Sequence, residues 1–161
     1  MRDIVSISGM LFVFVLAIAL LTNNYQVHGQ KPGEAEARRW LDEFNASFNR
    51  HDAKGAAASY TKDADQRVST GELLRGREEI EKYLADLFQR NPQVKQRLSL
   101  TSARFSGTDL LLAEGVWEIT GLPKGRRAKG VATYFLRNHD QRWLCVAGRS
   151  MVPTQRPEAK K

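Results

Sequence analysis

The sequence predicts an α+β domain in which N-terminal helices pack on one face of a curved antiparallel sheet. Two observations support this prediction: helical patterns dominate the first half of the chain, and four consecutive strand patterns fill the second half. Runs of helices followed by runs of strands are typical of this fold class. Helices along one face of a twisted sheet leave a cone-shaped cavity between the two layers, which a small ligand could enter.

The chain of 161 residues has the length of one domain. Its hydrophobic content of 42% and charged content of 27% are those of a globular protein, which excludes a disordered chain. The single cysteine excludes an intrachain disulfide and a cysteine-rich zinc module. The formal net charge of +7 is compatible with nucleic acid, a membrane surface, an anionic ligand or only a solvated surface.

The N-terminus differs from the rest of the chain, because Arg2 and Asp3 precede an uncharged, mostly apolar run over residues 4–21. A polar segment follows and ends at Gly29, a small residue suited to cleavage. This pattern predicts a signal peptide over residues 1–29 and a secreted or periplasmic protein. An uncleaved membrane anchor is the alternative, since the apolar run is just long enough to span a bilayer. The domain then covers residues 30–153, and residues 154–161 form a flexible basic tail.

Three helices are expected before the strands. Apolar residues at intervals of three and four predict the first, over residues 34–50: Trp40, Leu41, Phe44 and Phe48. Asp52 can cap a second, alanine-rich helix over residues 53–60. Residues 62–65 are expected to form a turn, and residues 67–74 two short extended segments around Gly71. An apolar stripe predicts the third helix, over residues 77–89: Ile80, Tyr83, Leu84 and Leu87.

Four long strands are expected next, over residues 94–105, 110–120, 130–137 and 143–152. In the second of them, Trp117 and Ile119 alternate with Glu118 and Thr120, so the strand has one apolar and one polar face. The turns between strands are rich in Gly, Asp and Asn, and residues 121–130 form a basic loop.

Two stretches of sequence carry a family resemblance. In the first, Tyr60 precedes the run Asp63-Ala64-Asp65, and Gly76-Arg77 then opens the third helix; in the second, residues 133–137 are followed by a turn and by Trp143. With the order of the elements, these stretches resemble the nuclear transport factor 2-like superfamily, and within it the SnoaL-like and ketosteroid-isomerase-like domains. The resemblance covers about residues 34–153. It implies a cone fold, frequently a homodimer, and in many cases a secreted protein of unassigned function.

The last strand departs from that resemblance. Related sequences often carry histidines there, at alternate positions that face the cavity. Here Ala147 and Arg149 occupy the matching positions, which argues against a histidine-assisted dehydratase or cyclase.

The resemblance makes Asp65 and Asp63 the best candidates for a general base, since ketosteroid-isomerase-like chemistry needs a carboxylate in an apolar pocket. Tyr60 could donate a hydrogen bond to a ligand oxyanion. Each residue has a structural alternative. An aspartate in a turn commonly caps backbone N–H groups, and a tyrosine that ends an apolar helix is commonly a core residue.

Several aromatic residues are candidates for lining the cavity, with ordinary core packing as the alternative: Trp40, Phe44, Tyr83, Trp117, Tyr134, Phe135 and Trp143. Arg149 is a further candidate, because a guanidinium buried among the apolar neighbours of its strand would need a carboxylate partner. That partner could be an acidic ligand or one of Asp63, Asp65 and Glu118. An exposed position at the end of the strand is the alternative for Arg149.

No metal site and no cofactor is expected. Without the signal peptide, the remaining histidines are His51 and His139, and each lies beside an aspartate in a turn without a ligand-spaced cluster. Cys145 lies between aliphatic residues and is expected to be a buried small hydrophobic residue. The loop over residues 121–130 lacks the pattern of a phosphate-binding P-loop.

Three functions remain open: an exported domain that binds a small apolar or acidic molecule, an isomerase, lyase or hydrolase with an aspartate base, and a homodimeric interaction module that uses the open sheet face. Residues 30–88 contain 10 Lys plus Arg and 12 Asp plus Glu, whereas residues 89–161 contain 14 and 5. The positive charge therefore belongs to the sheet half. Nucleic acid is not the expected partner, because export is predicted and no recognition motif is found. An acidic ligand or weak attraction to an anionic membrane surface fits the basic half better.

Overall fold

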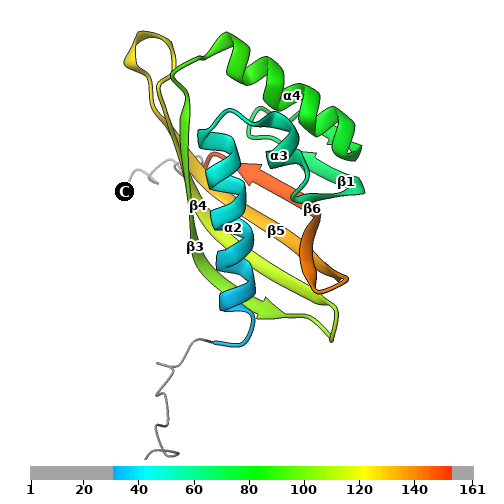
Figure 1. Cartoon of the computed structure of the whole chain (residues 1–161). Coiled ribbons are helices and arrows are strands. Elements are labelled where there is room, and N and C mark those ends of the chain that lie inside the picture. The colour runs from blue at the N-terminus through cyan, green and yellow to red at the C-terminus, as the bar shows by residue number, and fades with distance from the viewer. Residues whose placement is uncertain (1–30, 154–161) are drawn as a thin grey trace, which may run out of the picture. The chain divides into compact units, whose positions relative to one another are not determined.

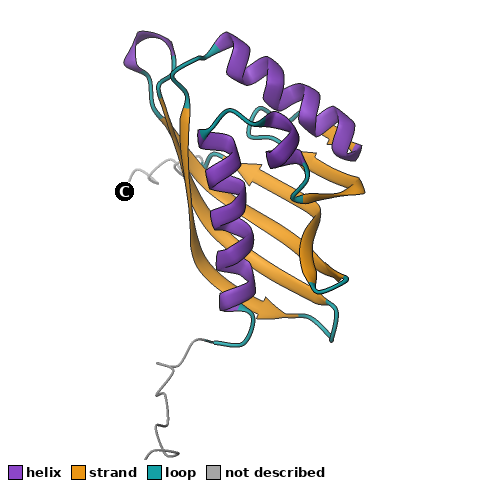
Figure 2. Ribbon diagram, viewed as in Figure 1, coloured by secondary structure: helices purple, strands orange, loops and turns teal. Residues whose placement is uncertain are grey.

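The computed structural model describes residues 31–153, and Figure 1 shows that they form helices along one face of a curved sheet. This arrangement confirms the α+β class predicted from the sequence. Figure 2 shows the same two layers by type of secondary structure. Along the chain the elements are α2 (Glu34–Asn49), α3 (Ala53–Ala57), β1 (Tyr60–Arg67), β2 (Leu73–Arg75), α4 (Gly76–Arg90), β3 (Lys95–Phe105), β4 (Leu110–Thr120), the 3₁₀ turn η2 (Pro123–Gly125), β5 (Ala128–His139) and β6 (Arg142–Met151).

The sheet has six strands in the order β2-β1-β6-β5-β4-β3. Neighbouring strands are antiparallel, except that β1 and β6 run parallel. Strands β3 to β6 lie where the four strand patterns predicted them, and β4 has the predicted bounds. Trp117 is buried whereas Glu118 is exposed, as the alternation in β4 predicts.

Helix α2 joins the two layers through aromatic packing. The Trp40 ring stacks on Phe44 with 5.6 Å between ring centroids, and it lies 4.7 Å from the ring of Tyr134 in β5. The indole N–H of Trp40 donates a hydrogen bond of 2.9 Å to the carbonyl of Ser59, directly before β1. The apolar stripe predicted from residue spacing is therefore the face that packs on the sheet.

The same helix also satisfies the backbone of β3, an edge strand of the sheet. The Asn45 side chain donates to the carbonyl of Leu98 at 2.8 Å and accepts from its N–H at 2.9 Å. The Asn49 side chain binds both backbone groups of Gln96 in the same way, each at 2.8 Å. These contacts cover backbone groups that an edge strand otherwise leaves unpaired, and they fix the position of β3 relative to α2.

Two local predictions around the Asp63-Ala64-Asp65 run are wrong. Helix α3 ends at Ala57, so Tyr60 begins a strand and does not end a helix. The expected turn over residues 62–65 belongs to β1, whose neighbours are β2 and β6. Ala64 is buried and Asp65 pairs with both β2 and β6, and together these contacts outweigh the turn propensity of the two aspartates.

Strands β1 and β2 form an antiparallel hairpin, and its turn begins at Val68, five residues after Asp63. The N–H of Val68 donates to the carbonyl of Glu72 at 3.0 Å, and the N–H of Gly71 donates to the carbonyl of Val68 at 2.9 Å. Gly71 has a φ angle of 95°, a left-handed conformation that glycine adopts without steric cost. The sequence therefore located the glycine of the turn correctly but not the strand that precedes it.

Helix α4 covers the sheet beside α2 and α3. Its buried residues are Ile80, Leu84 and Phe88, and Tyr83 and Leu87 are half-buried next to them. The guanidinium of Arg77 donates to the carbonyl of Tyr60, with 2.9 Å from Nε to the oxygen, which ties the start of α4 to the start of β1. The amphipathic stripe predicted for the third helix is confirmed by this packing.

The predicted signal peptide and the predicted basic tail lie outside the described residues. Between residues 31 and 153, no helix is both long and apolar enough to cross a membrane.

Candidate functional site

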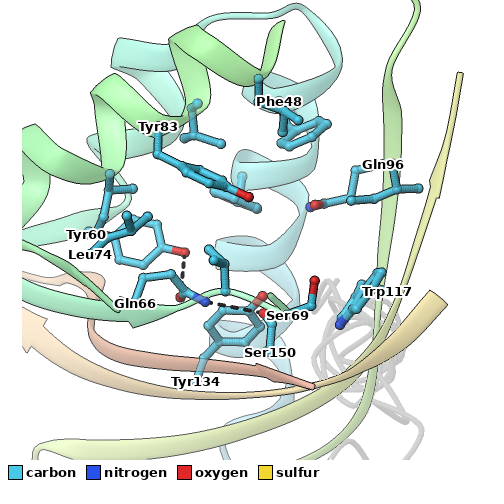
Figure 3. A pocket seen from close by; sticks show the side chains of 16 residues that line it. Phe48, Tyr60, Gln66, Ser69, Leu74, Tyr83, Gln96, Trp117, Tyr134 and Ser150 are labelled. Atoms are coloured by element: carbon cyan, nitrogen blue, oxygen red, sulfur yellow. Dashed lines mark hydrogen bonds between the residues drawn. The ribbon is translucent and has the colours of Figure 1, made fainter. Parts of the chain in front are cut away.

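The candidate site is a cavity of about 90 Å³ between the helices and the sheet. Figure 3 shows that its walls come from α2 and α4 on one side and from the strands on the other. Sixteen residues line it, and nine of them are aliphatic residues, phenylalanine or tryptophan. None of the sixteen is Asp, Glu, His, Lys or Arg. The site is therefore an apolar pocket with a few neutral polar groups.

A hydrogen-bonded chain crosses the floor of this cavity. The Tyr60 hydroxyl donates to Oε1 of Gln66 at 3.2 Å. Nε2 of Gln66 donates to the carbonyl of Arg67 at 3.0 Å and to Oγ of Ser150 at 3.3 Å. Figure 3 shows the links from Tyr60 through Gln66 to Ser150. Both N–H bonds of the Gln66 amide are therefore used within the protein.

The tyrosines of the cavity stay neutral. Burial raises the pKa of the Tyr60 hydroxyl well above its usual value, and burial has the same effect on the pKa of Tyr134. Burial also raises the pKa of Tyr83, whose side chain is half-buried. Since none of the other lining side chains ionises in the physiological range, the cavity carries no charge at neutral pH.

One buried side-chain nitrogen of the cavity lacks a partner among the described residues. Nε2 of Gln96, in β3, is buried and has no hydrogen-bond partner among the described residues. Figure 3 shows the amide end of Gln96 pointing across the cavity toward the hydroxyl of Tyr83. Buried donors of this kind are rare in folded proteins, because leaving one unsatisfied costs about 1–3 kcal/mol.

Five of the residues singled out in the sequence line this cavity: Tyr60, Phe44, Tyr83, Trp117 and Tyr134. Trp40 does not, because its ring is enclosed by Phe44, Tyr60 and Tyr134 in the core between α2 and the sheet. Its role is to hold the two layers together. Phe135 and Trp143, the other aromatic candidates, do not belong to the cavity lining either.

The structure does not place Asp65, Asp63 or Arg149 in the cavity. Arg149 and Asp65 form a two-pronged ion pair, with Nη1 to Oδ1 at 2.8 Å and Nη2 to Oδ2 at 3.0 Å. The carboxylate partner predicted for Arg149 is therefore Asp65. Both side chains remain about one-third exposed, and Asp63 is exposed as well.

A bulge explains why Arg149 was assigned to the wrong face. Leu136 pairs with Cys145, but Phe135 pairs with Ala147, so β6 holds one extra residue at this point. Cys145 faces the core, and counting by twos from it would bring Ala147 and Arg149 to the same face. The extra residue reverses the alternation. Ser150 therefore faces the cavity, and Arg149 lies on the opposite face of the sheet.

The polar residues of the cavity were not identified from the sequence: Gln66, Ser69, Gln96 and Ser150. Gln96 could have been found, because it lies two residues before Leu98 in a strand whose buried face includes Leu98. The inward direction of Gln66 could not be predicted, because residues 62–65 were expected to form a turn and not a strand. That of Ser150 could not be predicted because the bulge in β6 reverses the alternation of its side chains.

Within residues 31–153, no three His, Cys, Asp or Glu side chains lie close enough together to hold a metal ion. Cys145 is fully buried in the core, and burial raises the pKa of its thiol. It therefore packs as the small hydrophobic side chain that its neighbours in the sequence indicated.

Comparison with known proteins supports the fold. The family model of the SnoaL-like domain matches residues 37–146. No curated protein matches the chain. Among solved structures, a domain of unknown function with a cystatin-like fold from Nostoc punctiforme has a TM-score of 0.69 at 18% identity, covering 79% of this chain and 81% of that one. An uncharacterised protein with a cystatin-like fold from Caulobacter vibrioides has a TM-score of 0.67 at 18% identity, and the match covers 77% of this chain and 92% of that one. An NTF-2-like protein of unknown function from Shewanella oneidensis has a TM-score of 0.60 at 17% identity, and the match covers 73% of this chain and 97% of that one.

We expect the Asp65–Arg149 pair to be a structural contact. Replacing Asp65 with Asn should lower the free energy of unfolding by about 0.5–1 kcal/mol, because partly exposed pairs are screened by water. A double-mutant cycle with Arg149→Gln, measured by chemical denaturation, should give a coupling energy of similar size. The exposed Asp63→Asn is the control and should change stability by less than about 0.5 kcal/mol. A coupling energy of zero would contradict the assignment.

Proposed function

The chain belongs to the SnoaL-like domain family, and we propose that it binds a small, neutral, mainly apolar molecule in the cavity between helices and sheet without transforming it. The observation that carries this proposal is the absence of any ionisable carboxylate, imidazole or amine among the sixteen residues that line the cavity. A pocket lined by apolar side chains with a few fixed polar groups is typical of small-molecule sites.

The position of the aspartates weighs against the enzyme alternative. A general base must lie within hydrogen-bond reach of the proton that it removes, directly or through one water. Asp65 is instead engaged by Arg149 on the other face of the sheet, and Asp63 is exposed. Tyr60 lines the cavity, but its hydroxyl donates to Gln66 and its raised pKa keeps it protonated. The cavity thus offers hydrogen bonds and apolar contact, but no proton carrier.

The lack of charge also weighs against an acidic ligand. A carboxylate that enters an apolar pocket loses its hydration, and this loss is costly unless a cation or several donors replace the water. Arg149, the cation considered for that role, is not available to the cavity. A cavity of about 90 Å³ is several times larger than one water molecule requires, so it suits a molecule of several non-hydrogen atoms.

We also propose that the protein acts outside the cytoplasm. This proposal rests on the uncharged apolar run over residues 4–21 and the small residue Gly29 after it.

A second candidate function, homodimer formation, is favoured by the outer face of the sheet. Val116 and Met151 are 42% and 52% exposed, and both pair with Val131 in β5, so the three form an apolar row across three strands. A second row lies four residues further along, beyond the polar row of Glu114, Thr133 and Arg149; it consists of Leu112, Phe135 and Ala147. Adjacent apolar side chains on an exposed sheet face mark an interaction surface, and a second copy of the chain would offer the same rows in return.

The binding proposal can be tested with benzene as an apolar probe. Titration of the wild-type protein should shift the amide NMR signals of the residues that line the cavity and leave those of the outer sheet face unchanged. Val68→Trp should weaken benzene binding by roughly tenfold or more, since a large ring at this half-buried lining position occupies the cavity.

The matched control for this titration is Val152→Trp, because Val152 is 55% exposed and follows the last strand. It should bind benzene as the wild type does. Wild-type signals that do not respond to benzene at saturation, or equal binding by Val68→Trp, would refute the proposed cavity function.

The dimer proposal is tested by placing a charge on the apolar rows. Val116→Lys and Met151→Lys should each shift the protein from dimer to monomer in light scattering at micromolar concentration, because a two-fold interface brings like charges together. Ala35→Lys is the control, because Ala35 is exposed on α2. A wild-type protein that is monomeric under these conditions would rule out the dimer.

A further inference from the structure

We propose that the ligand of the cavity carries a neutral hydrogen-bond acceptor, such as a ketone or ether oxygen, and that Nε2 of Gln96 donates to it. This inference rests on the proposed function and narrows the chemical class of the ligand. It predicts a molecule with an apolar body and one oxygen acceptor, and it assigns the recognition of that oxygen to the β3 side of the cavity.

The amide of Gln96 carries a buried donor that no described residue satisfies. Nε2 of Gln96 is buried and unpartnered among the described residues, although it lies in a cavity wall that is otherwise largely apolar. Leu or Ile at this position would avoid the cost of the buried donor. A ligand acceptor would remove that cost and would gain a hydrogen bond in a region of low dielectric constant.

The position of Gln96 is fixed by its backbone contacts. Its backbone N–H and carbonyl both bind the Asn49 side chain at 2.8 Å, so β3 cannot move away from α2 at this point without breaking both bonds. Leu98 is held by Asn45 in the same way and is buried on the same face. The two asparagines therefore set which face of the strand Gln96 occupies, and the amide is directed into the cavity before any ligand arrives.

On the cavity floor, the amide of Gln66 and the hydroxyl of Tyr60 already use their donors. Gln66 donates to Arg67 and Ser150, and Tyr60 donates to Gln66. Opposite Gln96 lies the hydroxyl of Tyr83, which makes no hydrogen bond to another described residue (Figure 3). A ligand oxygen between them could accept from Gln96 and from Tyr83 together. Burial raises the pKa of Tyr83, so this hydroxyl keeps the proton that it would donate.

The acceptor must be neutral for the reason that excludes acidic ligands from this cavity. Among the sixteen lining residues there is no lysine, arginine or histidine to replace the hydration of an anion. A carbonyl or ether oxygen accepts at most two hydrogen bonds, and the amide of Gln96 and the phenol of Tyr83 can donate both.

The experiment compares two probes of the same shape, cyclopentanone and methylenecyclopentane, which differ by an oxygen in place of a CH₂ group. In the full chain, the side-chain amide signal of Gln96 should shift on addition of cyclopentanone and should stay in place with the hydrocarbon. Gln96→Met keeps the length of the side chain and removes only its polar end. It should weaken cyclopentanone binding about 2–10-fold, the size of one net hydrogen bond, and leave methylenecyclopentane binding unchanged or tighter.

Gln93→Met is the control, because Gln93 is exposed just before β3 and the same substitution there should alter neither affinity. If neither probe binds the wild-type protein, the proposed binding function fails and this inference fails with it. If both probes bind but Gln96→Met changes both affinities equally, or the Gln96 amide signal does not respond to the ketone, the inference is overturned while the binding function stands.

Discussion

The packing of Trp40 between helix α2 and the sheet is the constraint on which the rest of the domain depends. Its ring contacts Phe44 on its own helix, Tyr60 in β1 and Tyr134 in β5, and its N–H binds the carbonyl of Ser59. This contact holds the helix against the middle of the sheet, and it places Tyr60 and Tyr134 so that their other edges form the cavity floor. Helix α4 then closes the space from the other side. The cavity is thus what remains when an aromatic cluster fills only part of the gap between two layers.

Charge is kept out of that space by the alternation of the strands. Asp65 of β1 and Arg149 of β6 lie on the outer face, where they neutralise each other at the surface. The inner face carries Gln66, which donates both amide N–H bonds within the protein, and Ser150, which accepts one of them. A cavity built in this way selects ligands by size, apolar surface and one hydrogen bond. The net charge of +7 therefore does not describe the site, and among the described residues the basic loop around η2 is exposed.

Much of the fold could be predicted from the sequence, because apolar residues such as Phe44, Ile80 and Trp117 recur at the spacing of a helix or of a strand. The cavity residues on α2, α4 and β4 follow from the same periods. The aspartates and Arg149 could not be placed, because their positions depend on a bulge in β6 and on strand pairing that overrides turn propensity. Such features arise from contacts between distant segments, and one inserted residue moves every following side chain to the other face. The role of Asn49 in positioning Gln96 is likewise a contact between residues 47 positions apart.

Native mass spectrometry tests most directly whether this domain holds a neutral molecule in its uncharged cavity. The protein would be purified from its own cells, measured intact, and its bound molecule identified after release. We expect a co-purifying compound that has an apolar body and an oxygen acceptor and carries no ionisable group. A protein that is free of any ligand, or one that carries a carboxylate, phosphate or amine in the cavity, would contradict the claim.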